Sequence, residues 1–140
     1  KLGIAAIGVG LAQGAYEMAL NYAKNRKQFG KSISNFQAIS FKLADMHMKI
    51  ELARNMLYKA CWLRDNNQHF SIEAAMIKLY SSEVAKEVAD EAVQIHGGYG
   101  LIKEYPIERF YRDQRMLQVG EGTSEIQRLI ISKYIGCYKK

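Results

Sequence analysis

A carboxylate flanked by two glycines near the end of the chain is the residue best placed to do chemistry. Glu121 stands between Gly120 and Gly122, and Thr123 follows as a candidate N-cap for a helix. Glycines leave the backbone sterically open, and a helix N-terminus has unpaired N–H groups. The arrangement predicts a carboxylate that projects into a cavity as a general base. The alternative is a loop glutamate that helps to start a helix.

Three other segments combine polar groups with breaks between helices. Residues 26–30 (Arg-Lys-Gln-Phe-Gly) either hold a phosphate or form a solvated basic loop. Residues 94–100 (Gln-Ile-His-Gly-Gly-Tyr-Gly) either stop a helix or let a flat ligand or a phosphate approach bare backbone. We expect Arg112, Asp113 and Arg115 to pair with one another and to hold the loop that bears Glu121.

Histidine and cysteine spacings argue against metal and nucleophilic catalysis. The three histidines form no Glu-x-x-His pair and fit no zinc pattern. A Ser-His-Asp arrangement has no local motif to support it. Cys61 and Cys137 are far apart in helical patterns, and we expect reduced thiols, as in an intracellular protein. The sequence therefore predicts no metal site.

Composition predicts one globular domain of long helices. The 140 residues are 49% hydrophobic and contain one proline. The net charge of +6 comes from cations interleaved with acids, which favours affinity for small anions over nucleic acid. We expect no membrane-spanning stretch and no signal peptide. Because residue 1 is not methionine, we expect a fragment.

Apolar residues three or four apart predict three long helices. The first spans residues 2–25, with Gly3, Gly10 and Gly14 allowing a neighbouring helix to approach closely. Its predicted packing face holds Ile4, Ile7, Leu11, Ala15, Met18 and Tyr22.

The second helix follows a cap at Ser34 or Asn35 and ends near residues 64–67. Its face holds Phe36, Ile39, Leu43, Met46, Ile50, Ala53, Leu57 and Ala60. The third runs from Ser71 to a glycine stop at residues 97–98, with Ile77, Val84, Val88, Ala92 and Ile95 on one face.

A short helix follows Pro106, a last helix runs from Thr123 to about Tyr134, and no strand pattern is convincing. The predicted fold is all-α, an up-and-down helical bundle of three long helices plus one or two short C-terminal helices.

Five segments taken in order are more specific than any one alone: residues 26–30, 36–39, 94–100, 111–113 and 121–128. Together they resemble the C-terminal helical domain of the acyl-CoA dehydrogenase family, nearest to its short- and medium-chain, butyryl-CoA dehydrogenase-like members. The resemblance covers essentially the whole chain. It implies that residues 1–140 are this domain, and that the family's N-terminal helical and middle β domains are absent from the chain.

The resemblance implies an FAD-dependent dehydrogenation of an acyl-CoA thioester to a trans-2-enoyl-CoA, with Glu121 removing the α-proton. The backbone of Gly122 is similar to the position that lies against the thioester, and Lys1 aligns where many members have an arginine. Arg26 and Gln28 resemble residues that hold FAD, usually the cofactor of a neighbouring subunit. The full set of implied FAD contacts is Arg26, Gln28, Gln37, Gln94, Ile95, His96, Gly97, Gly98, Thr123 and Glu125.

Gly120 departs from members that have a tyrosine before the catalytic glutamate, which implies a wider acyl pocket and a branched or bulkier short acyl chain. The implied partners are an acyl-CoA, an electron-transfer flavoprotein and other copies in a homotetramer or dimer. The implied location is the cytoplasm, or the mitochondrial matrix of a eukaryote. We expect the isolated domain to be inactive. A non-catalytic helical interaction module and an acyl-CoA oxidase on the same fold remain as alternatives.

Overall fold

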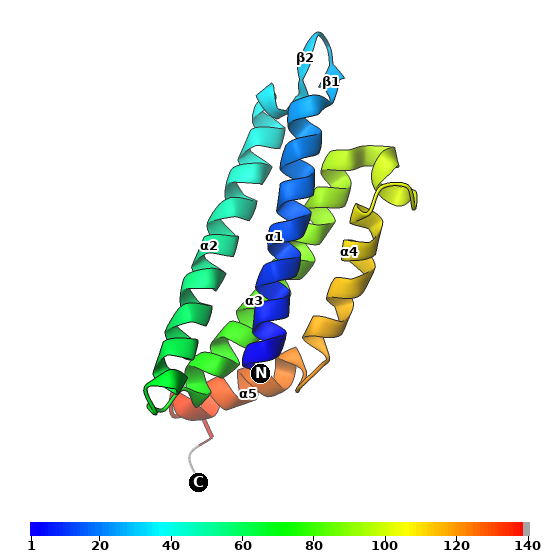
Figure 1. The fold of residues 1–140 in the computed structure, drawn as a ribbon. Helices are drawn as coiled ribbons and strands as arrows, with labels where there is room; N and C mark the ends of the chain where they lie inside the picture. Colours follow the sequence, from blue (N-terminus) through cyan, green and yellow to red (C-terminus); the bar gives the residue numbers. More distant parts are fainter. Residues whose placement is uncertain (139–140) are drawn as a thin grey trace.

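Four helices of alternating direction form the bundle, and a fifth crosses its lower end (Figure 1). A computed structural model describes residues 1–138. The helices are α1 (Leu2–Asn25), α2 (Gln37–Asp65), α3 (Ser71–His96), α4 (Ile107–Asp113) and α5 (Ser124–Tyr134). Short 3-10 turns lie at Ile33–Asn35, Gly97–Leu101 and Gln114–Gln118. The predicted all-α bundle of three long and two short helices is confirmed.

Small residues let α1 approach α3 closely. The buried face of α1 consists mainly of alanines, among them Ala12 and Ala19, both 0% exposed, whereas Ile7 on the predicted face is 50% exposed. A Cβ on Gly8 would lie 3.0 Å from the Ser81 Oγ of α3, so Gly8 belongs to the contact. The predicted face was therefore wrong in part, because alanine and glycine carry this packing in place of larger side chains.

The predicted close approach at three glycines of α1 holds at one of them. A Cβ on Gly14 would lie 2.8 Å from the Phe110 ring of α4. Gly3 and Gly10 have nothing within 4 Å of such an atom, so the prediction was wrong for both.

The faces predicted for α2 and α3 form the core. Six of the eight predicted residues of α2 are buried, and so are all five of α3. The ion pairs Lys42–Glu91 and Lys49–Glu87 join the two helices beside this core. The predicted cap of α2 was wrong, because residues 33–35 form a 3-10 turn and the helix starts after Phe36 without a side-chain cap.

A two-residue hairpin turn separates α1 from α2, where no strand was predicted. Strand β1 (Lys27–Gln28) pairs antiparallel with β2 (Lys31–Ser32). The turn residues Phe29 and Gly30 both have positive φ, 52° and 78°, as a type I′ hairpin requires. The hairpin fixes Arg26 at the end of α1 and Gln28 on the first strand.

Helix α1 is long and apolar enough by composition to cross a membrane, because a window of 18 residues within it has a mean hydropathy of 1.2. The sequence-based expectation that no stretch would meet this measure was therefore wrong. Its alanine face is buried inside the bundle, and the core helices of globular domains meet the same measure.

Candidate functional site

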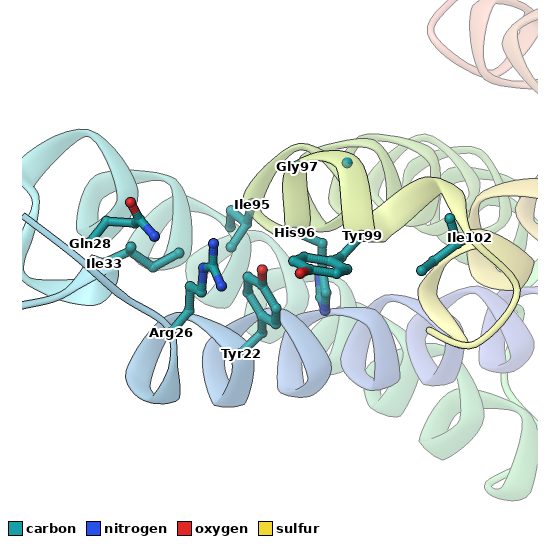
Figure 2. Close-up of a pocket in the computed structure, with 10 residues that line it drawn as sticks. Tyr22, Arg26, Gln28, Ile33, Ile95, His96, Gly97, Tyr99 and Ile102 are labelled. Atoms are coloured by element: carbon teal, nitrogen blue, oxygen red, sulfur yellow. The ribbon is translucent and has the colours of Figure 1, made fainter.

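A hollow of about 510 Å³ opens at the upper end of the bundle, where the end of α1 meets the end of α3 (Figure 2). Six of the predicted cofactor residues line it: Arg26, Gln28, Ile95, His96, Gly97 and Gly98. The fold thus brings together residues that are about 70 positions apart in the sequence, as expected when α1 and α3 pack closely. Gln37 and Gln94 are exposed and lie outside this lining.

Three glycines beside the hollow have different structural reasons. Gly97 ends α3 with φ of 60°, and its N–H donates to the carbonyls of Val93 and Gln94, which confirms the predicted helix stop. A Cβ on Gly100 would lie 2.7 Å from the Val93 carbonyl oxygen. Gly98 has neither constraint, because its φ is not positive and a Cβ there would meet nothing within 4 Å. The fold does not require glycine at 98, and its effect is bare backbone in the wall of the hollow.

Aromatic rings form the inner wall of this hollow. His96 is 6% exposed and stacks on Tyr22 with ring centroids 4.3 Å apart. Burial lowers the pKa of His96 below 6.5, against a smaller opposing effect of its hydrogen bond with the Ala92 carbonyl at 2.7 Å. Because a carbonyl can only accept, the His96 Nδ1 carries a hydrogen and donates it to the Ala92 carbonyl. Burial thus disfavours a positive charge on this wall.

Arg26 supplies the positive charge of the hollow. Its guanidinium carbon lies 5.6 Å from the centroid of the Tyr99 ring, and Figure 2 shows it beside Tyr22 and near the Gln28 amide. An exposed fork of N–H donors on an aromatic wall suits an anionic, partly flat ligand. Tyr22, which the sequence analysis did not select as a site residue, lies four positions before Arg26 and therefore on the same side of α1.

The glycine-flanked carboxylate lies at the opposite end of the bundle. Glu121 and Gly122 have φ values of 53° and 99°, and the Glu121 side chain is 53% exposed. Thr123 caps α5 as predicted, since its Oγ1 accepts the Ile126 N–H at 3.4 Å. The Glu121 carboxylate also pairs with the α-ammonium group of Lys1. That ion pair requires a free amino group and would be lost in any polypeptide extended before Lys1.

A second hollow, of about 260 Å³, lies beside the start of α5. It is lined by Glu83, Arg115, Gln118, Val119, Thr123, Ser124, Glu125 and Arg128. The hydroxyl of Ser124 is buried and has no hydrogen-bond partner among the described residues. The Glu125 carboxylate accepts hydrogen bonds from the Glu125 backbone N–H and from the Thr123 hydroxyl, and both lower the pKa of Glu125. Thr123 and Glu125, both predicted cofactor residues, therefore share one polar site.

The loop that bears Glu121 is not held as predicted. Arg112 pairs with Glu108 within α4 at 2.8 Å, and Arg115 donates to Gln118 at 2.5 Å. The loop is instead bound by two buried side chains that the sequence analysis missed. Lys78 of α3 and Gln127 of α5 both donate to the Gly122 carbonyl, at 2.6 and 3.1 Å.

Helix α1 separates the two ends of the site. It has 24 residues, and at 1.5 Å per residue it is about 36 Å long. Arg26 follows its last residue, whereas Glu121 touches the residue before its first. Within one chain, Arg26 and Glu121 therefore cannot act on the same atom.

The part of the chain that the structure describes contains no cluster of side chains suited to binding a metal ion. Residues 1–138 contain no group of three or more His, Cys, Asp or Glu side chains that could hold a metal ion. Cys61 and Cys137 are free thiols, as predicted.

The chain is similar to known proteins over nearly its whole length. Residues 1–136 match the family model for the acyl-CoA dehydrogenase C-terminal domain. The chain is 56% identical over 135 residues to a probable acyl-CoA dehydrogenase of Bacillus subtilis, covering 96% of this chain and 36% of that protein. It is 52% identical over 132 residues to a subunit of the caffeyl-CoA reductase–Etf complex of Acetobacterium woodii, covering 94% of this chain and 35% of that one.

The solved structures that resemble this chain include butyryl-CoA dehydrogenase from Megasphaera elsdenii, with a TM-score of 0.94 and 46% sequence identity. The match covers 96% of this chain and 35% of that one. The chain thus spans about a third of the length of the relatives that it matches.

Proposed function

The chain belongs to the acyl-CoA dehydrogenase family, and we propose that residues 1–140 are the C-terminal helical domain of an enzyme that oxidises an acyl-CoA to a trans-2-enoyl-CoA. The observation that carries the proposal is the position of Glu121. The carboxylate stands on a left-handed turn at the head of α5, in a chain that matches the family over residues 1–136.

Glu121 is the proposed base. The thioester carbonyl acidifies the neighbouring Cα–H, and the Glu121 carboxylate accepts that proton. The second hydrogen leaves Cβ as a hydride, for which FAD supplies the acceptor when bound. One proton and one hydride are lost, and the Cα–Cβ single bond becomes a double bond. Gly122 lies next to the base with no side chain, so its backbone can lie against the thioester.

The hollow at the end of α1 fits the anionic part of FAD. Arg26 offers a guanidinium fork for a pyrophosphate, Gln28 offers an amide, and residues 95–98 offer apolar surface and bare backbone. Gln37 and Gln94 have exposed side chains and are proposed as contacts outside the hollow. Thr123 and Glu125 at the opposite end are proposed as contacts near the reacting ring.

The separation of the two ends supports an oligomer. A base must lie within about 3.5 Å of the carbon from which it takes a proton, and the hydride acceptor must meet the adjacent carbon. Arg26 is about 36 Å from that point in the same chain. The hollow of one copy therefore serves a cofactor whose reacting ring lies at the Glu121 of another copy, in a homodimer or homotetramer.

We expect the isolated chain to show no acyl-CoA oxidation. Each end of the domain carries part of a site, and the chain spans about a third of its relatives. The measurement is anaerobic reduction of added FAD by butyryl-CoA in the presence of the purified 140-residue chain, with the full-length enzyme as the positive control. Measurable reduction above the background without the chain would contradict the expectation.

Gly120 bears on the width of the acyl pocket. A Cβ there would lie 3.2 Å from the Met116 Sδ and 3.3 Å from the Met116 carbonyl oxygen, so Met116 leaves little room for a side chain at position 120. We expect kcat/KM for isobutyryl-CoA within about tenfold of that for butyryl-CoA, since a methyl group that fits poorly costs about 10–200-fold. Gly120→Ala should lower kcat/KM for isobutyryl-CoA more than kcat/KM for butyryl-CoA. Strict preference of the unaltered enzyme for butyryl-CoA would count against this.

An electron-transfer flavoprotein is the proposed acceptor. The relative from Acetobacterium woodii is named as a subunit of a complex with Etf. The proposed location is the cytoplasm, with which the free thiols are consistent. Reoxidation of the reduced enzyme by such a protein much faster than by oxygen would support a dehydrogenase, and the reverse order would indicate an oxidase.

A further inference from the structure

A fully buried lysine lies beneath the turn that carries Glu121. Lys78 is 0% exposed and stands on α3 among small buried residues such as Ala74, Ala75 and Ser82. Its ammonium group donates to the Gly122 carbonyl at 2.6 Å. The chemistry proposed above makes no use of this cation.

Burial of a charge is costly to stability. Removing an ammonium group from water costs several kcal/mol, and an apolar side chain of similar length would avoid that cost. Burial lowers the pKa of Lys78, the carboxylates of Glu121 and Glu125 raise it, and the charge of Lys1 lowers it. The groups that compensate the buried cation therefore belong to the Glu121 turn and the first turn of α5.

The conformation of that turn needs support. A non-glycine residue with φ of 53° is uncommon, and Glu121 is followed by Gly122 at 99°. The Gly122 carbonyl receives two donors from different helices, Lys78 and Gln127, and both side chains are 0% exposed. A Cβ on Gly122 would lie 2.8 Å from the Gln127 Nε2, so the donor is packed directly against the turn.

We propose that Lys78 is a positioning residue that clamps the Gly122 carbonyl and so fixes the direction in which the Glu121 carboxylate points, with Gln127 as the second clamp. The inference rests on the proposed function of Glu121 as the base. Loss of the clamp leaves the carboxylate in place but misdirected. A displacement of about 1 Å at a reacting group can cost about 100-fold in rate.

The test is Lys78→Met in the full-length enzyme. Anaerobic flavin reduction by butyryl-CoA, followed across substrate concentrations, separates the limiting rate from the apparent Kd. We expect the limiting rate per bound FAD to fall about 10- to 100-fold. The Kd for butyryl-CoA should rise by a smaller factor than the limiting rate falls, because the Gly122 backbone lies against the thioester whereas proton abstraction depends on the direction of the carboxylate. The FAD content should be unchanged.

Val88→Ala is the matched control for lost stability. Val88 is buried on the same helix, ten residues and about 15 Å from Lys78, outside both hollows. It should lower the melting temperature with the limiting rate unchanged. A folded Lys78→Met enzyme that reduces its flavin as fast as Val88→Ala would overturn the proposal.

Gln127→Met provides a second route if Lys78→Met does not fold. It removes the other donor and should lower the limiting rate in the same direction by a smaller factor. A wild-type limiting rate in folded Gln127→Met would overturn the clamp. Glu121→Gln measured in parallel separates the two failures: if it keeps its rate, the proposed function fails, and if it alone loses its rate, only the positioning role fails.

Discussion

Replacing Glu121 by glutamine in the full-length enzyme should lower the rate of acyl-CoA dehydrogenation about 10²- to 10⁴-fold. That range is the usual contribution of a general base, and an amide of the same shape cannot accept a proton. FAD binding should be retained, because the hollow around Arg26 lies at the other end of α1. The measurement is turnover of butyryl-CoA with an artificial electron acceptor, expressed per bound FAD.

Glu17→Gln is the control for this substitution. Glu17 is exposed in the middle of α1, and its change removes the same charge from the chain away from both hollows. It should turn over at the wild-type rate. Equal rates in Glu121→Gln and Glu17→Gln, with FAD bound in both, would show that Glu121 is not the base.

Arg26→Ala should weaken FAD binding by the apoenzyme about 10- to 100-fold. A hydrogen bond to a charged group contributes about 1.5–3 kcal/mol, and each 1.4 kcal/mol is a factor of ten in affinity. The guanidinium lines the hollow with exposed donors and no ion-pair partner among the described residues, so the pyrophosphate would be its main anionic partner. The measurement is the Kd for FAD from titration of the apoenzyme.

Lys27→Ala provides the matched comparison for Arg26. Lys27 is the next residue, carries the same charge and is exposed, yet it does not line the hollow. Its replacement should change the Kd for FAD by less than about threefold. Equal weakening by both variants would mean that the hairpin attracts FAD by its net charge, and that the guanidinium contact contributes nothing specific.

Periodicity predicted the helices well because large apolar residues mark the buried faces of α2 and α3. Ile50, Val88 and Ile95 stand in those patterns and are buried. The same rule misled for α1, where Ile7 is half exposed and alanines are buried. Small residues carry little hydrophobic signal, yet they set the distance between α1 and α3. Their role depends on the neighbouring helix, which no local pattern contains.

The site was predictable to the extent that its residues lie in local motifs. Arg26, His96 and Gly98 belong to separate segments that meet in one hollow. Lys78 stands alone in a helical stripe of small residues, and its contact with Gly122 joins positions 44 apart. A lone cation within such a stripe is a signal that sequence reading can use, since exposed faces carry charges in groups. The carbonyl that it binds is visible only in three dimensions.

Exchange of the substrate α-hydrogen with solvent tests the role of Glu121 most directly. The full-length enzyme is incubated in D₂O with an acyl-CoA analogue that has an acidic α-C–H but cannot lose a hydride from Cβ, and deuterium incorporation is followed by NMR. We predict exchange by the wild-type enzyme and none above background by Glu121→Gln with FAD bound. Exchange at the wild-type rate in Glu121→Gln would contradict the assignment of Glu121 as the base.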